Sequence, residues 1–271
     1  MGALRANPRD IALVTGASSG IGEALALVCA QHQYDLILVA RNQQKLKALA
    51  TQLKQEYGVE VSVKPCDLTV PGAVKLLSEE LLSEGKQVDI LINNAGVLEH
   101  GAFVNIAPDD HHNIVQLNVV ALTAMLAHLL PTMVARGSGR VLNVASMGAF
   151  QPLPSVATYS ATKAFVLSLS EALAEEVRGT GVTVTALCPG LTATNMMANA
   201  QQKSPTLVKI PRFVVADAYS VAQKGFRGCL KGKTIVVPGL KYMFISILSR
   251  ATPKWLVRCV TGIVGRATIS R

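Results

Sequence analysis

The chain has 271 residues, of which 50% are hydrophobic and 4% aromatic, and its formal net charge is +9. This length suits one large α/β domain, and the composition argues against a disordered or collagen-like chain. The five cysteines are odd in number and scattered, without a CxxC pair. The sequence therefore predicts neither a disulfide framework nor a metal site, and a reducing, cytoplasmic location is expected.

Neither a leader nor a membrane span is expected. The first ten residues lack the apolar core of a signal peptide, and no uninterrupted apolar run reaches the roughly 20 residues of a spanning helix. We therefore expect a soluble protein, or one held peripherally at a membrane surface.

Apolar runs alternate with helical patterns along the chain. Strands are expected at residues 11–15, 35–40, 59–64, 88–93, 140–145, 182–188 and 234–237, and helices at 20–31, 43–57, 70–84, 109–136, 157–177 and 217–230. Near-continuous Val, Ile and Leu runs are typical of parallel strands buried on both faces. The pattern predicts the α/β class: a Rossmann-type, doubly wound, seven-stranded parallel sheet in one catalytic domain (residues 9–238), followed by a C-terminal helical extension (residues 239–271).

A glycine-rich turn, TGASSGIG at residues 15–22, joins the first strand to the first helix. Glycines let the backbone approach a pyrophosphate, whose charge then lies at the positive end of the helix. The spacing GxxxGxG is not the commonest fingerprint, and a purely structural turn is the alternative. Its place at the first strand–helix junction favours a dinucleotide site. The candidate cofactor-binding residues of this turn are Gly16, Ser18, Ser19, Gly20, Ile21 and Gly22.

The end of the second strand bears on the choice of cofactor. No acid stands there to bind a ribose 2′-hydroxyl, and Arg41 is placed to pair with a 2′-phosphate instead. The alternative is an ordinary solvated arginine. The sequence favours NADP(H), with NAD(H) as the second choice.

A helix carries Tyr159 and Lys163 four residues apart, and Ser146 ends the strand before it. Positions i and i+4 share one helix face, so the two side chains project together. A tyrosine has a pKa of about 10, and a nearby ammonium lowers that pKa towards neutrality. The set fits a tyrosine acid or base beside a serine that holds a substrate oxygen. The alternative is a plain surface helix, which is what a Tyr-x-x-x-Lys pattern by itself usually marks.

Several motifs stand in a fixed order along the chain. They are TGASSGIG at 15–22, Asp67-Leu68, Asn93-Asn94-Ala95-Gly96, Asn118, Ser146, Tyr159, Lys163 and Pro189-Gly190. In this set and order, residues 9–238 resemble the short-chain dehydrogenase/reductase family.

The resemblance implies a role for each matching residue. Tyr159 transfers the proton, Ser146 polarises the carbonyl, Lys163 lowers the tyrosine pKa and contacts the nicotinamide ribose, and Asn118 helps to hold a relay water. The remaining cofactor contacts that it implies are Asp67, Leu68, Asn93, Ala95, Gly96, Pro189, Gly190, Thr192 and Thr194. Taken singly, Asn118, Ser146 and Asp67 also fit structural roles. Some family members carry a basic residue where this chain has Ser19, so selectivity for NADP depends on Arg41.

The C-terminal extension is basic and amphipathic. Residues 203–271 hold 13 Lys and Arg against Asp217 alone, and apolar residues recur with helical spacing at 240, 243, 244, 247 and 248 and again from 255 to 264. Basic amphipathic helices of this kind can lie in the interface of an anionic membrane, although amphipathic helices are also the ordinary building block of soluble proteins. Closing the substrate pocket or packing on a second subunit are the alternatives. No nucleic-acid motif appears, so nucleic acid is not an expected partner.

The favoured function is transfer of a hydride between NADP(H) and a carbonyl or alcohol. An apolar loop, residues 191–215, with Met196 and Met197, favours a lipophilic ketone, aldehyde or 3-oxoacyl substrate. The alternatives are an NAD-linked alcohol dehydrogenase and a non-catalytic, NADP-binding regulatory or scaffold protein. The family resemblance also suggests a homodimer or homotetramer formed through helices 109–136 and 157–178.

Overall fold

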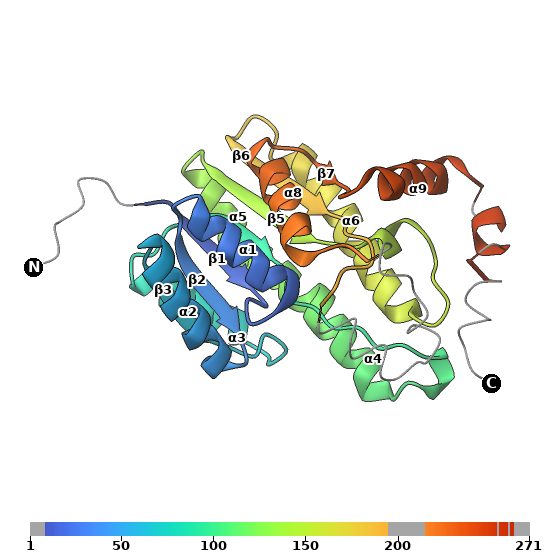
Figure 1. Cartoon of the computed structure of the whole chain (residues 1–271), viewed down its shortest axis with the longest axis horizontal. Coiled ribbons are helices and arrows are strands. Elements are labelled where there is room, and N and C mark those ends of the chain that lie inside the picture. The colour runs from blue at the N-terminus through green and yellow to red at the C-terminus, as the bar shows by residue number, and fades with distance from the viewer. Residues whose placement is uncertain (1–8, 195–214, 254, 260, 263–271) are drawn as a thin grey trace, which may run out of the picture.

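The computed structural model describes residues 9–194, 215–253, 255–259 and 261–262. Its centre is a seven-stranded sheet of order β3-β2-β1-β4-β5-β6-β7, in which every neighbouring pair is parallel (Figure 1). The strands are β1 (Ile11–Thr15), β2 (Asp35–Ala40), β3 (Val61–Pro65), β4 (Val88–Asn93), β5 (Gly139–Val144), β6 (Val182–Leu187) and β7 (Ile235–Val236). The predicted parallel α/β sheet is confirmed.

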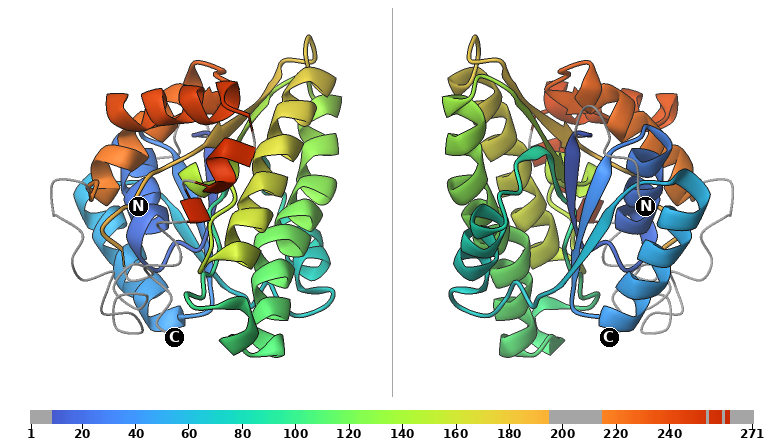
Figure 2. Two further views of the ribbon diagram at one scale, coloured as in Figure 1. Left: turned by 90° about the vertical axis from the view of Figure 1, so that its right-hand side faces the viewer. Right: turned by 90° about the vertical axis from the view of Figure 1, so that its left-hand side faces the viewer.

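Helices cover both faces of the sheet, as Figure 2 shows in two opposed views. One face packs against α1 (Gly20–Gln31), α2 (Gln43–Tyr57) and α8 (Ala218–Leu230). The other packs against α3 (Ala73–Ser83), α5 (Leu122–Ala135) and α6 (Ala157–Glu176). Each face therefore has its own apolar core, which explains why the strands are hydrophobic on both sides.

The long helix expected at residues 109–136 is continuous but not uniform. It consists of α4 (Pro108–Val115), a π-helical segment η2 (Gln116–Ala121), and α5. Helix α3 begins at Ala73 rather than at residue 70, because Gly72 before it has a φ of +81°. Strand β3 likewise begins two residues later than expected.

By length and composition alone, the continuous helix Pro108–Ala135 is apolar enough to cross a membrane, although no apolar run of that length was expected from the sequence. Its inward residues Met125, Leu126 and Met133 are buried against the sheet. Core helices of globular proteins pass the same test, so the helix is weak support for a span.

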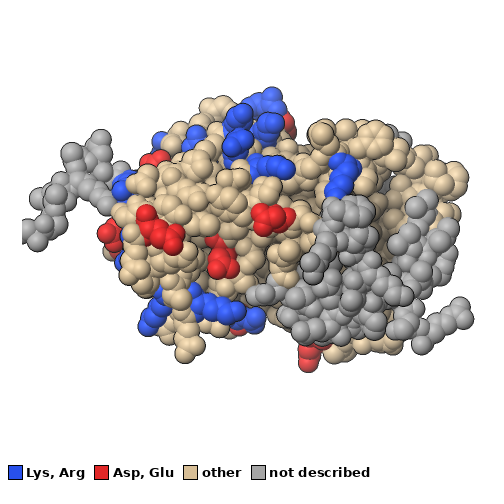
Figure 3. Space-filling view, viewed as in Figure 1, with Lys and Arg blue, Asp and Glu red and all other residues tan. Residues whose placement is uncertain are grey.

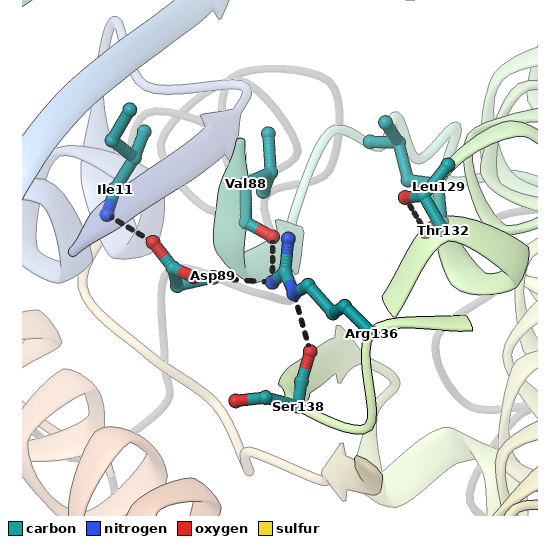
Figure 4. A network of polar contacts seen from close by, with 7 residues as sticks. All are labelled: Ile11, Val88, Asp89, Leu129, Thr132, Arg136 and Ser138. Carbon is teal, nitrogen blue, oxygen red and sulfur yellow. Dashed lines mark hydrogen bonds and ion pairs between the residues drawn. The ribbon is translucent and has the colours of Figure 1, made fainter. Parts of the chain in front are cut away.

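A polar network joins the amino ends of β1 and β4, opposite the edge that carries the site (Figure 4). Asp89 accepts a hydrogen bond from the backbone N–H of Ile11 at 2.7 Å and pairs with Arg136 at 3.1 Å. Arg136 also donates to the carbonyl oxygen of Val88. Burial raises the pKa of Asp89, which the hydrogen bond and the arginine partly offset.

A short chain of buried polar side chains crosses the middle of the sheet. Asn93 Nδ2 donates to Asn143 Oδ1 at 2.9 Å, between paired residues of β4 and β5. Asn143 Nδ2 donates to Ser170 Oγ on α6 at 3.0 Å. These contacts tie the two strands to the helix that carries the tyrosine and lysine.

Candidate active site

A cavity of about 930 Å³ lies at the carboxyl ends of the strands. It lies beside the point where β1 and β4 are neighbours but their connections run to opposite faces, the place where open α/β sheets bind ligands. Most of the predicted site residues line it. They are Gly16, Ser18, Ser19, Gly20, Ile21, Arg41, Asp67, Leu68, Ala95, Gly96, Ser146, Tyr159, Lys163, Pro189, Gly190, Thr192 and Thr194. Three predicted residues, Gly22, Asn93 and Asn118, are not in the cavity wall and lie behind it.

The glycine-rich turn forms one end of this cavity. Gly16 has a φ of +67°, and a Cβ on Gly22 would lie 2.3 Å from the carbonyl oxygen of Gly16. The two glycines are therefore required by backbone conformation and by close approach, respectively. Ser19 precedes α1 without a side-chain capping bond, so its side chain leaves the first-turn N–H groups available to an anion. The turn fits a bound pyrophosphate.

Asn94 holds this turn, although the sequence analysis did not choose it. Its Nδ2 donates to the carbonyl oxygens of Thr15 at 3.0 Å and Gly16 at 3.3 Å. Thr15 Oγ1 in turn accepts from the backbone N–H groups of Asn94 and Ala95, both at 3.0 Å. Asn93, the neighbour that was predicted to line the cleft, is turned into the sheet towards Asn143. Adjacent strand residues point to opposite sides, and the sequence alone did not distinguish the two asparagines.

Arg41 and Asp67 lie together at the other side of the turn. Arg41 Nη1 is 4.0 Å from Asp67 Oδ2, and its side chain is 67% exposed. Thr69 donates to Asp67 Oδ1 from its hydroxyl at 2.7 Å and its backbone N–H at 3.0 Å. These bonds hold the pKa of Asp67 below its usual value, against the effect of burial. A loosely held, exposed guanidinium here fits a 2′-phosphate.

Ser146, Tyr159 and Lys163 meet in the cavity. Ser146 follows β5, where its Oγ accepts from the backbone N–H of Gly148 at 3.0 Å. Burial raises the pKa of Tyr159, and a hydrogen bond with Ser146 lowers it. Lys163 Nζ donates to the carbonyl oxygen of Val144 at 2.8 Å and lies 5.8 Å from the centre of the Tyr159 ring. The serine and lysine thus flank the tyrosine as their spacing predicts.

Lys163 is a buried cation, and this affects its titration. Burial lowers its pKa to about 8. The ammonium form predominates at neutral pH and is lost as the pH rises through that value. A neighbouring ammonium favours the phenolate of Tyr159. That Lys163 lowers the tyrosine pKa remains a prediction.

Asn118 lies in η2, and its amide is fully engaged. Its Oδ1 accepts from the backbone N–H of Val97 at 2.9 Å. Its Nδ2 donates to the carbonyl oxygen of Val97 at 3.0 Å and to Thr162 Oγ1 at 3.1 Å. A Cβ on Gly96 would lie 3.1 Å from Asn118 Oδ1 and 3.4 Å from Lys163 Nζ. Asn118 therefore fastens the loop after β4 to α6, close to the lysine, and its part in a proton relay remains a prediction.

The C-terminal extension reaches the same cavity. Helix α9 (Leu240–Ala251) contacts the short helix η3 (Met147–Phe150), which directly follows Ser146. A Cβ on Gly190 would lie 2.2 Å from the ring of Tyr242, and Thr261 lines the cavity wall. Closing of the substrate pocket by this extension was one of the alternatives from the sequence, but the individual contacts could not be predicted, because they join segments more than fifty residues apart.

Two further predictions concern metal and the apolar loop. Among the residues that the structure describes, no cluster of His, Cys, Asp or Glu could hold a metal ion. His111 stacks on Phe103, with ring centres 4.2 Å apart, and its Nδ1 is 2.8 Å from Thr158 Oγ1. Met196 and Met197, which were predicted to line an apolar pocket, lie outside the described residues.

A glycine-rich turn that fits a pyrophosphate and a serine–tyrosine–lysine set in one cavity are features of an oxidoreductase that acts on C=O or CH–OH groups with a nicotinamide cofactor. Residues 10–205 match the family model for short chain dehydrogenases. The chain belongs to the short-chain dehydrogenase family.

Relatives in this family include proteins with stated activities. A very-long-chain 3-oxoacyl-CoA reductase of Pyrenophora tritici-repentis is 37% identical over 220 residues, which cover 79% of this chain but only 64% of the relative. A short-chain dehydrogenase of Sphingobium yanoikuyae, solved with NADPH, has 33% identity and a TM-score of 0.78, covering 88% of this chain and 92% of that one. A bulky-bulky ketone specific alcohol dehydrogenase of Comamonas testosteroni has 28% identity and a TM-score of 0.76, covering 98% and 96%.

Proposed function

We propose that the protein is an NADPH-linked carbonyl reductase for lipophilic ketones, aldehydes or 3-oxoacyl compounds. The observation that carries the proposal is the meeting of Ser146, Tyr159 and Lys163 in a cavity whose other end is the glycine-rich turn. A protein that only bound the cofactor would not need the three catalytic groups together.

The residues divide the reaction between them. A reduced nicotinamide cofactor, held by the glycine-rich turn at residues 15–22 and by Lys163, would supply the hydride that the carbonyl carbon takes up. Ser146 donates a hydrogen bond to the carbonyl oxygen and orients it, and Tyr159 transfers its proton to that oxygen as negative charge develops. The ammonium of Lys163 stabilises the phenolate that remains. The carbonyl is thereby reduced to an alcohol, and the tyrosine takes up a proton from solvent before the next turnover.

The preference for NADP(H) rests on Arg41 and on the absence of an acidic residue at the end of β2. The Arg41 side chain is exposed and only loosely paired with Asp67, so it can turn to a 2′-phosphate. The relative from Sphingobium yanoikuyae was solved with NADPH. Arg41→Gln should weaken NADPH binding roughly 10- to 30-fold, because a charge-assisted pair with the 2′-phosphate contributes about 2 kcal/mol to binding. NADH binding should be unchanged. Lys45→Gln, an exposed cation at the start of α2, is the matched control. Equal losses for both cofactors would remove the basis of the preference.

The lipophilic substrate class rests on the rest of the cavity wall. Beyond the cofactor residues, the wall includes the apolar side chains Val97, Leu98, Met147, Leu153 and Leu191. Such walls select substrates by apolar contact. The names of two relatives, a very-long-chain 3-oxoacyl-CoA reductase and a bulky-ketone dehydrogenase, point the same way.

The deciding experiment follows oxidation of NADPH and NADH with carbonyls of graded chain length, in wild type and Tyr159→Phe. We expect turnover with NADPH that rises with chain length and vanishes in the variant. Turnover only of small polar carbonyls would defeat the substrate class, and survival of activity in Tyr159→Phe would defeat the catalytic assignment. Cofactor binding without any turnover would favour the scaffold alternative, and a preference for NADH with alcohols would favour the NAD-linked dehydrogenase.

An oligomer built on α4–α6 is part of the proposal. Val115, Val120, Val134 and Phe165 are exposed apolar residues of these helices. Exposed apolar residues of this kind mark association surfaces when they gather in one patch. Light scattering should give the mass of a dimer or tetramer, and Phe165→Asp should lower it. The predicted peripheral membrane contact is a separate matter, because it concerns α9 rather than the cavity.

A further inference from the structure

Helix α9 is packed with its polar side inwards. Ser246 is buried, and Tyr242 and Ser249 are partly buried. Tyr242 lies against Gly190, and Ser249 Oγ lies 3.4 Å from Gln151 Oε1. Surface helices of globular proteins ordinarily bury their apolar stripe and expose the polar one. In α9 this arrangement is reversed.

The outward side of α9 is strongly apolar. Leu240 is 80% exposed, Phe244 68% and Ile247 58%. Met243, Ile245 and Leu248 are also exposed. Positions 240, 243, 244, 247 and 248 follow helical spacing, so they form one continuous stripe. Trp255 and Leu256, in the helical turn that follows, are 60% and 41% exposed. At the place of α9 in Figure 1, the surface in Figure 3 is largely uncharged.

The segment that carries this stripe has charges of a single sign. No acidic residue follows Asp217 in the sequence, whereas the same stretch holds ten Lys and Arg. Lys241 adjoins the stripe, with its Nζ 5.2 Å from the ring centre of Tyr242, and Arg258 is exposed beyond it. An apolar stripe with Phe and Trp and a cationic border is the composition of helices that lie in the interface of an anionic bilayer.

A second copy of the chain fits this surface less well. A two-fold interface through α9 would bring together two copies of a basic segment that holds no acidic residue after Asp217 to pair with its Lys and Arg. An anionic lipid surface supplies the opposite charge and an apolar layer for the stripe at the same time.

We propose that the outward face of α9, together with the exposed Trp255 and Leu256, docks the protein on an anionic membrane surface. The proposal does not depend on the catalytic activity. Because α9 contacts η3 and Thr261 lines the cavity, docking would hold the bilayer beside the elements that surround the active site.

The test is sedimentation of the full-length protein with phosphatidylcholine vesicles, with and without phosphatidylglycerol. Wild type should bind the anionic vesicles, and this binding should weaken at high salt. Its binding to neutral vesicles should be weak. Phe244→Ser/Ile247→Ser should lower the partition coefficient about a hundredfold, since each buried apolar side chain contributes roughly a factor of ten or more. Lys241→Gln should lower it about fivefold on anionic vesicles only.

The matched control is Leu76→Ser/Leu82→Ser on α3, whose two leucines are at least about as exposed, at 67% and 77%. It should bind as wild type does, and so should Tyr159→Phe, which separates this proposal from the catalytic one. Unchanged thermal unfolding would show that the α9 variant is folded. Failure of wild type to bind anionic vesicles, or full binding by the α9 variant, would overturn the proposal. A change from dimer to monomer in the α9 variant, without vesicle binding by wild type, would assign the face to a second copy instead.

Discussion

Replacing Asn118 by alanine separates a structural role from a chemical one. The change removes three hydrogen bonds, two to the backbone of Val97 and one to Thr162. Thr162 still donates its own hydrogen bond to the carbonyl oxygen of Tyr159 at 2.7 Å. Breaking its bond with Asn118 therefore costs little stability. The Val97 groups are partly buried, and each unpaired group then costs about 1 kcal/mol, at the low end of the range for buried groups. We expect a total loss of about 2–3 kcal/mol in the free energy of unfolding.

Differential scanning calorimetry measures this loss directly. For a chain of this size, about 2–3 kcal/mol corresponds to a fall in Tm of roughly 5–10 °C. His112→Ala, an exposed position on α4, should leave Tm unchanged. The pH profile of reduction adds a second readout, since a purely fastening role lowers stability without moving the profile. A Tm within about 1 °C of wild type would refute the reasoning that the amide fastens the loop to α6.

Three further outcomes follow from the same structure. Burial lowers the pKa of Lys163 to about 8, so its ammonium form is present below that pH and lost above it. We therefore expect kcat/KM for NADPH in carbonyl reduction to fall above about pH 8. A flat profile to strongly alkaline pH would contradict this. Gly22→Ala places a Cβ 2.3 Å from a backbone oxygen of the turn and should weaken NADPH binding at least about tenfold, as measured by calorimetry. The control is Gly58→Ala, where the space is open but the φ is +64°. It should lower the free energy of unfolding by about 1 kcal/mol and leave the Kd for NADPH unchanged. Arg136→Ala leaves the part-buried Asp89 carboxylate without its cation. It should lower the free energy of unfolding in urea by about 2 kcal/mol and leave the Kd for the cofactor unchanged. An unchanged unfolding midpoint would show that the pair contributes nothing to stability.

Much of the fold could be predicted because its signals are local. The ranges of β1, β2, β4, α1 and α2 follow from apolar runs and glycines, and the structure places them at the predicted residues. The π-helical segment η2 could not be predicted, because its apolar pattern continues that of the flanking helices. Its effect is on the backbone, and no side-chain type signals it.

The position of a residue in the cavity could be predicted where a motif contains it, and not where it depends on long-range contacts. Ser146, Tyr159 and Lys163 follow from spacing and from the family resemblance. The positions of Asn93 and Tyr242 do not: the first depends on which way a strand residue turns, and the second on packing across the chain. Periodicity likewise predicted the apolar stripe of α9 but not that the stripe faces outwards. A periodic pattern shows which residues share one helix face, but not what that face packs against.

The buried polar chain from Asn93 through Asn143 to Ser170 has a consequence for folding. If β5 slipped by one residue against β4, it would move by about 3.3 Å and turn its side chains to the opposite faces. The hydrogen bond between the Asn93 and Asn143 amides would then be broken within the apolar core. Unpaired polar groups in such a place lower the free energy of unfolding. Asn94 directly follows β4, and Ser146 stands two residues after β5, so the same slip would also separate the cofactor loop from the catalytic serine. Strand alignment and active-site geometry are therefore selected together: a misaligned sheet would be both less stable and unable to react.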